Sequence, residues 1–322
     1  MVDCAVDWTR IGPPIDVRRM FPVERDELLT LLGSLTEADW LAPTVCPGWT
    51  VHDLTAHIVH DYLRRLSAGR DGWSAGWTPV PDAELAPVLN RANDEFVATA
   101  RGLSPRVLIA LLAGFGPQLD EYWSTIDPDA TGVSVSWAVP DAPAPAWLDV
   151  AREYTELWVH QQQIRSAVGR PGADSRPLTY PVIDTFLRAL PQALADADGA
   201  SVTVRVTAPV DDAWTARRGD GGWFLRRGEL PPPDGRQPEA GGAPEADGAT
   251  EANGVPEADG APEAGGATEA DGVPDARLEL SPETLWQVAT RGLTPAEALE
   301  RTAVTGDTAL ATSALHLVSI VR

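Results

Sequence analysis

The chain has 322 residues, a formal net charge of −22, and 25 basic residues of which none is lysine. The lack of lysine excludes a Walker-type phosphate loop, a Schiff-base enzyme and a pyridoxal anchor, because each needs that amine, and the acidic balance argues against nucleic acid or anionic membrane surfaces as partners. Two cysteines are too few for a disulfide framework, no apolar run is long enough to span a membrane, and the N-terminus lacks the features of a secretory signal, so we expect a reduced, cytoplasmic protein.

Residues 13–196 are predicted to form a helical domain. Apolar residues recur at helical spacing in several segments, and Thr50 with Asp53 forms a capping-box pattern at the start of one of them. The simplest architecture is an antiparallel four-helix bundle with short additions. The expected helices are 15–35, 50–68, 82–100, 105–125, 147–168, which stops at Gly169, and 181–195.

Residues 197–322 are predicted to form a small α+β domain. Residues 201–230 alternate between apolar and polar in the manner of strands, and the clearest strands are at 201–206 and 222–226. A further short strand is predicted at 277–280. Helical patterns follow at 282–290, 295–301 and 308–321. The fold class is therefore α+β with two domains.

A degenerate six-residue repeat interrupts the second domain. Residues 231–276 contain 11 acidic side chains and one arginine among Pro, Ala and Gly, and account for −10 of the net charge. Such a segment cannot bury enough apolar area to offset its ordering entropy, so we predict a disordered, solvated insertion. A hexapeptide β-helix is the competing interpretation, but the repeat lacks a large aliphatic residue to stack inward.

Two imidazoles and a carboxylate are the strongest chemical signal. His57 lies on the second predicted helix, and Glu156 and His160 lie four residues apart on the helix over 147–168. Two such helices facing each other would provide three donors for a catalytic divalent ion and leave one coordination position open. Spacing alone leaves alternatives: a Glu–His pair at this spacing is common on solvated helix faces, and His52 or His60 fits the periodicity as well as His57 does.

Two motifs carry a resemblance to a known family. The segment 42–57, APTVCPGWTVHDLTAH, and the run from Glu156 through His160 to Gly169-Arg170-Pro171 resemble the signatures of the mycothiol-dependent maleylpyruvate isomerase family, which belongs to the DinB type of metal-binding four-helix proteins. The resemblance implies that His57, Glu156 and His160 hold the metal, usually zinc. Segments 285–292 and 304–311 are more loosely similar to the sterol-carrier-like α+β domain that follows the bundle in such proteins.

The resemblance also implies a mechanism. A zinc-bound thiol, mycothiol, loses its proton near neutral pH and becomes a nucleophile. The thiolate adds to an electrophilic or unsaturated small molecule, either as a cis–trans isomerase of a maleylpyruvate-like acid or as a thiol S-transferase. Many relatives have aspartate where this chain has Gln163, three residues after the ligand histidine; glutamine accepts a hydrogen bond but adds no charge.

Other readings of these residues stay open. Arg64 and Arg165 are candidate ligands for a substrate carboxylate, although solvent-facing helix arginines are the simpler interpretation. Cys46 is expected to be a packed loop thiol, and Trp49 and Trp158 are expected to be core residues. Two other functions would use the same triad: a non-catalytic metal-binding module whose C-terminal domain binds a ligand or partner, and a hydrolase that activates metal-bound water.

Overall fold

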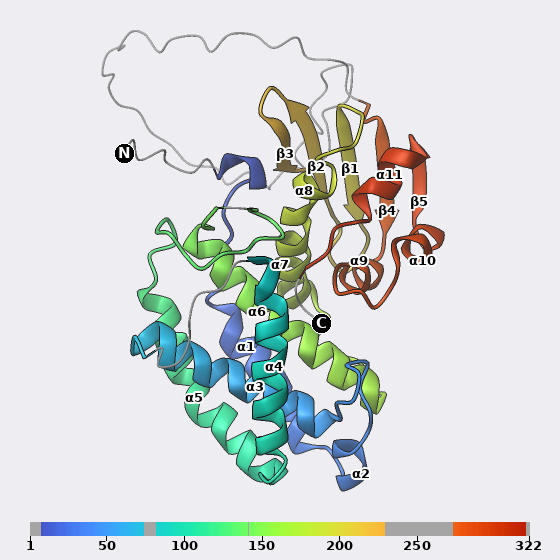
Figure 1. The fold of residues 1–322 in the computed structure, drawn as a ribbon. Coiled ribbons are helices and arrows are strands. Elements are labelled where there is room, and N and C mark those ends of the chain that lie inside the picture. The colour runs from blue at the N-terminus through green and yellow to red at the C-terminus, as the bar shows by residue number, and fades with distance from the viewer. Residues whose placement is uncertain (1–7, 74–81, 141, 229–272, 320–322) are drawn as a thin grey trace, which may run out of the picture.

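The structure is a computed structural model that describes residues 8–73, 82–140, 142–228 and 273–319. Figure 1 shows helices gathered at one end of the molecule and a β-sheet with further helices at the other. Most of the predicted insertion, 231–276, lies outside the described residues. None of the helices in the described ranges is both long and apolar enough to cross a membrane.

Four helices form the predicted bundle, which is confirmed. α1 (Met20–Gly33) contacts α5 (Pro105–Thr125) and α6 (Ala146–Val168), and α3 (Val51–Arg64) also contacts both, so the four helices close a ring. α4 (Asp82–Ala100) packs on α3 from outside the ring. Two short elements complete this part: η1 (Thr9–Ile11) and α2 (Glu37–Trp40).

The boundaries of α3 and α6 follow from their capping residues. At the start of α3, Thr50 Oγ1 accepts a hydrogen bond from the Asp53 amide at 3.3 Å, and Asp53 Oδ2 accepts one from the Thr50 amide at 3.1 Å. α6 ends at Gly169, whose φ of 63° is the left-handed conformation that glycine adopts without a Cβ clash. α3 continues directly into a π-helical turn, η2 (Arg65–Arg70), which widens the helix beside the site described below.

The helix predicted over 181–195 was placed wrongly. α7 begins earlier, at Arg176, and ends at Phe186, with Pro181 inside it and Pro177 in its first turn, where a missing amide costs least. A 3-10 turn, η3 (Leu187–Ala189), and the short helix α8 (Leu190–Ala193) follow. The predicted domain boundary at 196/197 falls in the connection to the first strand and stays a prediction.

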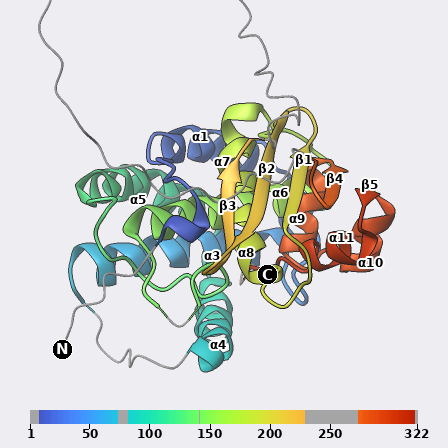
Figure 2. The ribbon, with the colours of Figure 1, turned by 90° about the horizontal axis from the view of Figure 1, so that it is seen from above.

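The sheet is mixed and has the strand order β3-β2-β1-β4-β5 (Figure 2). The central pair, β1 with β4, is parallel, with Val204 opposite Leu278, and the other pairs are antiparallel. The alternating patterns of the sequence predict β1, β3 and β4, but they do not separate β2 or indicate β5, which has only four residues. The elements are β1 (Ser201–Val206), β2 (Asp212–Gly219), β3 (Gly222–Arg227), β4 (Ala276–Leu280), α9 (Pro282–Ala289), α10 (Pro295–Glu300), β5 (Ala303–Gly306) and α11 (Thr308–Ala314).

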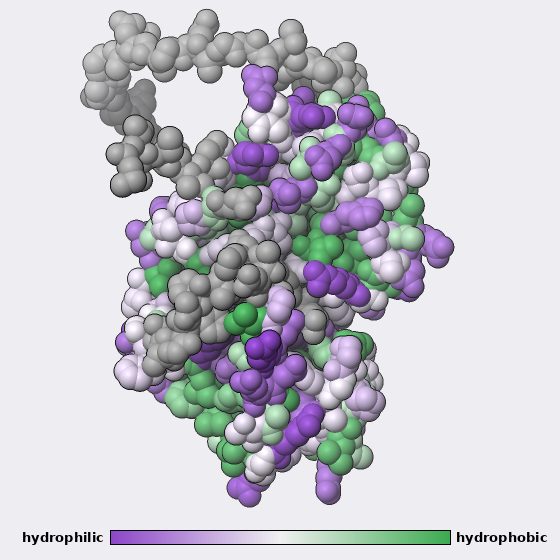
Figure 3. Space-filling model, in the orientation of Figure 1, coloured by the Kyte–Doolittle hydropathy of each residue, from purple (hydrophilic) through white to green (hydrophobic). Residues whose placement is uncertain are grey.

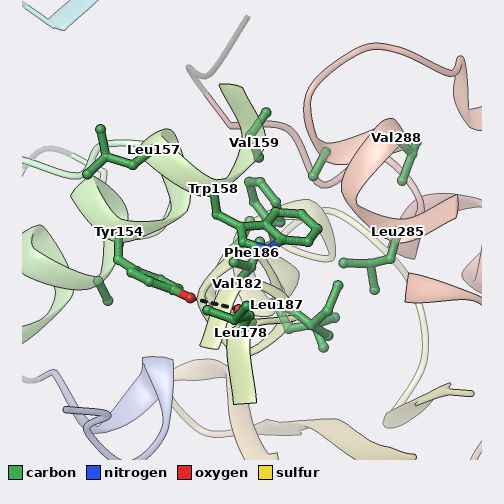
Figure 4. Close-up of a cluster of buried hydrophobic side chains, with 14 of the residues drawn as sticks. Tyr154, Leu157, Trp158, Val159, Leu178, Val182, Phe186, Leu187, Leu285 and Val288 are labelled. Carbon is green, nitrogen blue, oxygen red and sulfur yellow. Dashed lines mark hydrogen bonds between the residues drawn. The ribbon is translucent and has the colours of Figure 1, made fainter. Parts of the chain in front are cut away.

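One hydrophobic core runs through the helices and the sheet. Trp158 of α6 lies among side chains of α7 and α9 (Figure 4), and its ring meets that of Trp286 edge-on at 6.1 Å between centroids. The Trp158 indole donates to the Ala173 carbonyl at 2.8 Å, so its polar atom is satisfied. On the face drawn in Figure 3, hydrophilic and hydrophobic residues are interspersed.

Candidate metal centre

The structure brings together the three side chains that the sequence singled out. Facing helices α3 and α6 place His57 Nε2 3.1 Å from His160 Nε2, and Glu156 Oε1 lies 3.9 Å from the first nitrogen and 3.3 Å from the second. Donors about 2.1 Å from a tetrahedral zinc ion lie about 3.4 Å from one another, so these separations suit a shared divalent ion. Both histidines are buried.

Glu156 and His160 each stabilise the ionised form of the other. Burial disfavours the ionised form of Glu156, but hydrogen bonds from His160 and His57 outweigh it and lower the carboxyl pKa. Burial likewise disfavours protonated His160, but the hydrogen bond and charge of Glu156 raise its pKa. Since a metal ligand must be an unprotonated imidazole, protons compete with a metal for His160.

Gln163 lies beside His160, one turn further along α6. Its Oε1 lies 2.8 Å from His160 Nδ1 and also accepts a hydrogen bond from the Cys46 thiol at 3.4 Å. Because this oxygen only accepts, Nδ1 of His160 carries a proton, so a metal would bind at Nε2 in place of the proton that Nε2 otherwise donates to Glu156. His57 is held differently: it packs against Trp49 at 5.2 Å between ring centroids, and its Nδ1 is buried without a hydrogen-bond partner among the described residues.

The triad opens into a cavity of about 910 Å³ formed by α3, η2, α4, α5, α6 and the segment 126–137. A volume of this size accommodates two small organic molecules or one of drug size. Asp61, one turn after His57 on α3, also lines it, with Oδ2 3.4 Å from His57 Nε2. Aromatic side chains form much of the remaining wall: Trp49, Trp73, Tyr122, Trp123 and Trp137.

A buried arginine, a half-buried arginine and two buried carboxylates form a network at the cavity wall. Arg65 donates to Asp149 Oδ1 and to Glu153 Oε1, both at 2.6 Å. Arg152 lies 2.6 Å from the same Asp149 oxygen and 2.8 Å from the same Glu153 oxygen. Each charge is thus offset by two opposite ones, which a buried ion pair requires.

The two arginines proposed from sequence have different positions. Arg64 lines the cavity, with Nη2 3.2 Å from Asp61 Oδ1. Arg165 does not line it: its guanidinium binds Glu27 at 3.1 Å and Gln161 at 3.1 Å, on the side of α6 that faces α1. The expectation that Arg165 holds a substrate carboxylate is therefore wrong, because its donors are used between helices.

The other two α3 histidines lie away from the triad. His52 bonds the Leu103 carbonyl at 2.8 Å, and His60 stacks on Phe96 of α4 and lies 3.1 Å from Asn93. The sequence-based predictions did not include the network of Arg65 and Arg152, although the spacing of polar residues along α6 indicates it. Four polar residues of α6 recur at intervals of four, three and four, which is a second helical stripe beside the apolar one: Asp149, Glu153, Glu156 and His160.

The fold and the site together define a helical-bundle domain with a two-histidine, one-glutamate centre. Residues 21–165 match the family model of the mycothiol maleylpyruvate isomerase N-terminal domain, so the resemblance of this part of the chain to that family is confirmed. The match supports the expectation of an enzyme. No curated protein matches the sequence.

Two solved structures are similar to the chain. Both are crystal structures of the mycothiol-dependent maleylpyruvate isomerase, and one of them is of a variant with a histidine replaced by alanine. They are 12% and 13% identical to this chain, the alignments cover 90% of this chain and 92% of each of theirs, and the TM-score is 0.46 for both. Likeness at this level is too weak to place individual residues.

Proposed function

We propose that this chain is a divalent-metal-dependent enzyme that uses mycothiol as a thiol cosubstrate and joins its sulfur to an electrophilic small molecule. The observation that carries the proposal is the convergence of His57, Glu156 and His160 on one side of a large cavity. The family match to residues 21–165 supports mycothiol as the thiol. The same centre would serve a maleylpyruvate-like isomerase and a thiol S-transferase.

The residues present fit a zinc ion. His57 and His160 offer Nε2, Glu156 offers a carboxylate oxygen, and Gln163 accepts a hydrogen bond from Nδ1 of His160, so Nε2 is the nitrogen that would bind the ion. When bound, the ion would act as a Lewis acid that lowers the pKa of a thiol ligand. Trp49 packs beside His57 and limits the access of water to this end of the cavity.

Metal content tests the ligand set. The purified full chain should contain about one equivalent of zinc or a similar divalent ion by elemental analysis, and His57→Ala should lose it. His52→Ala is the matched control, because it makes the same change on the same helix at a residue that bonds Leu103 instead. Equal metal content in both variants would contradict the assignment.

Cobalt substitution tests the use of the thiol without relying on turnover. Adding mycothiol to the cobalt-loaded chain should produce the near-ultraviolet absorption of a sulfur-to-cobalt bond and should quench the reactivity of the thiol. Metal binding without that absorption would overturn the proposal and would favour a metal-activated-water hydrolase or a non-catalytic module.

A further inference from the structure

The charged residues of the cavity wall have a surplus of negative charge. Among the described lining residues are three arginines and five carboxylates: Arg64, Arg65, Arg152, Asp61, Asp94, Asp127, Asp149 and Glu156. A divalent ion would neutralise this surplus and would leave no net positive charge. A substrate with one or two carboxylates would therefore enter a cavity that offers it no electrostatic attraction.

The arginines of the wall already have anionic partners. Arg65 and Arg152 share Asp149 and Glu153, and Arg64 is paired with Asp61. A substrate carboxylate that bound one of these arginines would share the guanidinium with a carboxylate already paired to it, and the two anions would repel each other at close range. Asp94 and Asp127 have no arginine partner among the described residues and so add to the repulsion.

The uncharged part of the wall favours a different kind of molecule. The cavity is lined by four aromatic side chains and two valines: Trp49, Tyr122, Trp123, Trp137, Val135 and Val150. The rings of Tyr122 and Trp123 lie 4.9 Å apart between centroids. Aromatic faces of this kind bind flat apolar groups because the contact buries apolar surface and allows the rings to stack.

We propose that the acceptor of the thiol is an uncharged electrophile with an aromatic or apolar body, such as an aryl enone, and not a dicarboxylate. This inference rests on the proposed function and makes S-transfer the reaction of that site. The thiol releases its proton to solvent, and its sulfur uses an electron pair to form a bond to the β-carbon. The double-bond electrons move to the carbonyl as an enolate, and a proton from water at the α-carbon completes the thioether.

Binding of unreactive analogues tests the inference apart from activity. Benzylacetone and 4-(3-oxobutyl)benzoate share a saturated ketone and differ only by a ring carboxylate. Four tryptophans line the cavity, so quenching of intrinsic fluorescence in the full chain reports occupancy. We expect benzylacetone to bind at least about tenfold more tightly, the effect of one unfavourable charge worth about 1.4 kcal/mol. Equal or tighter binding of the carboxylate, or binding of neither, would overturn the proposal.

Turnover with the matching enones tests it a second time. The ratio of kcat/KM for benzylideneacetone to that for its 4-carboxylate should exceed tenfold with mycothiol and the metal-loaded chain. Asp94→Asn removes one charge of the wall and should lower that ratio by about two- to threefold, as expected for an exposed charge. Glu95→Gln, the adjacent exposed residue of α4 outside the cavity, should leave the ratio unchanged.

The outcomes separate this inference from the proposed function. Absence of the cobalt–sulfur absorption would refute the use of mycothiol, whichever analogue binds. Presence of that absorption together with a preference for the carboxylate enone, or with equal effects of Asp94→Asn and Glu95→Gln, would refute only the substrate class.

Discussion

Two glutamates of the bundle, one half-buried and one buried, have opposite electrostatic environments. Glu156 faces two histidines, which keep it ionised. Glu24 of α1 is fully buried, and its Oε1 accepts a hydrogen bond from Gln161 at 2.8 Å, but Oε2 has no partner among the described residues. Burial raises the pKa of Glu24 to about 8 from its ordinary value of 4.5, so this carboxyl is neutral at pH 7.

Glu24 should make stability depend on pH. Because its pKa is higher in the folded state, the free energy of unfolding should fall by about 1.4 kcal/mol per unit as the pH rises from 4.5 towards 8. Glu24→Gln removes that contribution. Between pH 6 and pH 8, the free energy of unfolding measured with urea should therefore fall by about 2 kcal/mol more in the parent chain than in the variant. Asp26→Asn, an exposed position on the same helix, should show no such gain; a similar gain in both variants would refute the assignment to Glu24.

At the scale of elements, α3 links a local capping signal to the site. Its capping box begins at Thr50, seven residues before His57, and Arg101 reinforces the cap by binding Asp53 at 2.9 Å. The register of the helix, and hence the direction of the His57 side chain, follows from that start.

Thr50→Ala should destabilise the protein by about 1 kcal/mol, the usual effect of losing an N-cap hydroxyl. Thermal unfolding followed by circular dichroism measures this, and metal titration should show a weaker affinity with unchanged stoichiometry. Thr36→Ala removes the equivalent hydroxyl from the capping box of α2 and is the control, because α2 carries none of the three donors. An equal loss of metal affinity in Thr36→Ala would show that the effect is not transmitted through α3.

Local signals explain what could be predicted from the sequence and what could not. α4 and α5 start and end where propensity and proline predict, and the stop of α6 is a glycine in the conformation that only glycine favours. α7 was misplaced because Pro181 looks like a helix start but is buried inside α7. β5 was missed because it is a four-residue, largely exposed strand that is held by its pairing with β4. For the site, the donors were found from motif and spacing, whereas Arg152 and Arg165 look alike in the sequence and differ only in which helix faces them.

For the whole molecule, a buried charge network joins α7 to the sheet. Asp184 of α7 accepts hydrogen bonds from the Trp214 indole at 2.8 Å and from Arg227 at 2.7 Å, and it forms an ion pair with Arg188. Asp184 and Arg188 are fully buried, and several donors compensate the single carboxylate.

Asp184→Asn should destabilise the protein by about 3–5 kcal/mol, because it leaves the buried Arg188 without its counter-charge. A single thermal transition, seen equally by tryptophan fluorescence and circular dichroism, should shift to lower temperature, since one core spans helices and sheet. Asp212→Asn removes only a half-exposed pair with Arg176 at 3.7 Å and should change stability by less than about 1 kcal/mol. Two separate transitions in the parent chain would contradict a shared core.

The parallel pairing of β1 with β4 has a consequence for synthesis. All three donors of the metal centre have been synthesised once residue 160 has been added, but β1 must wait for residues 276–280 before its second edge is covered. Nascent chains that end between these two strands expose the unpaired edge of β1 beside a finished bundle, and such edges recruit other chains. The interval between the two strands is therefore when the growing polypeptide most needs a chaperone.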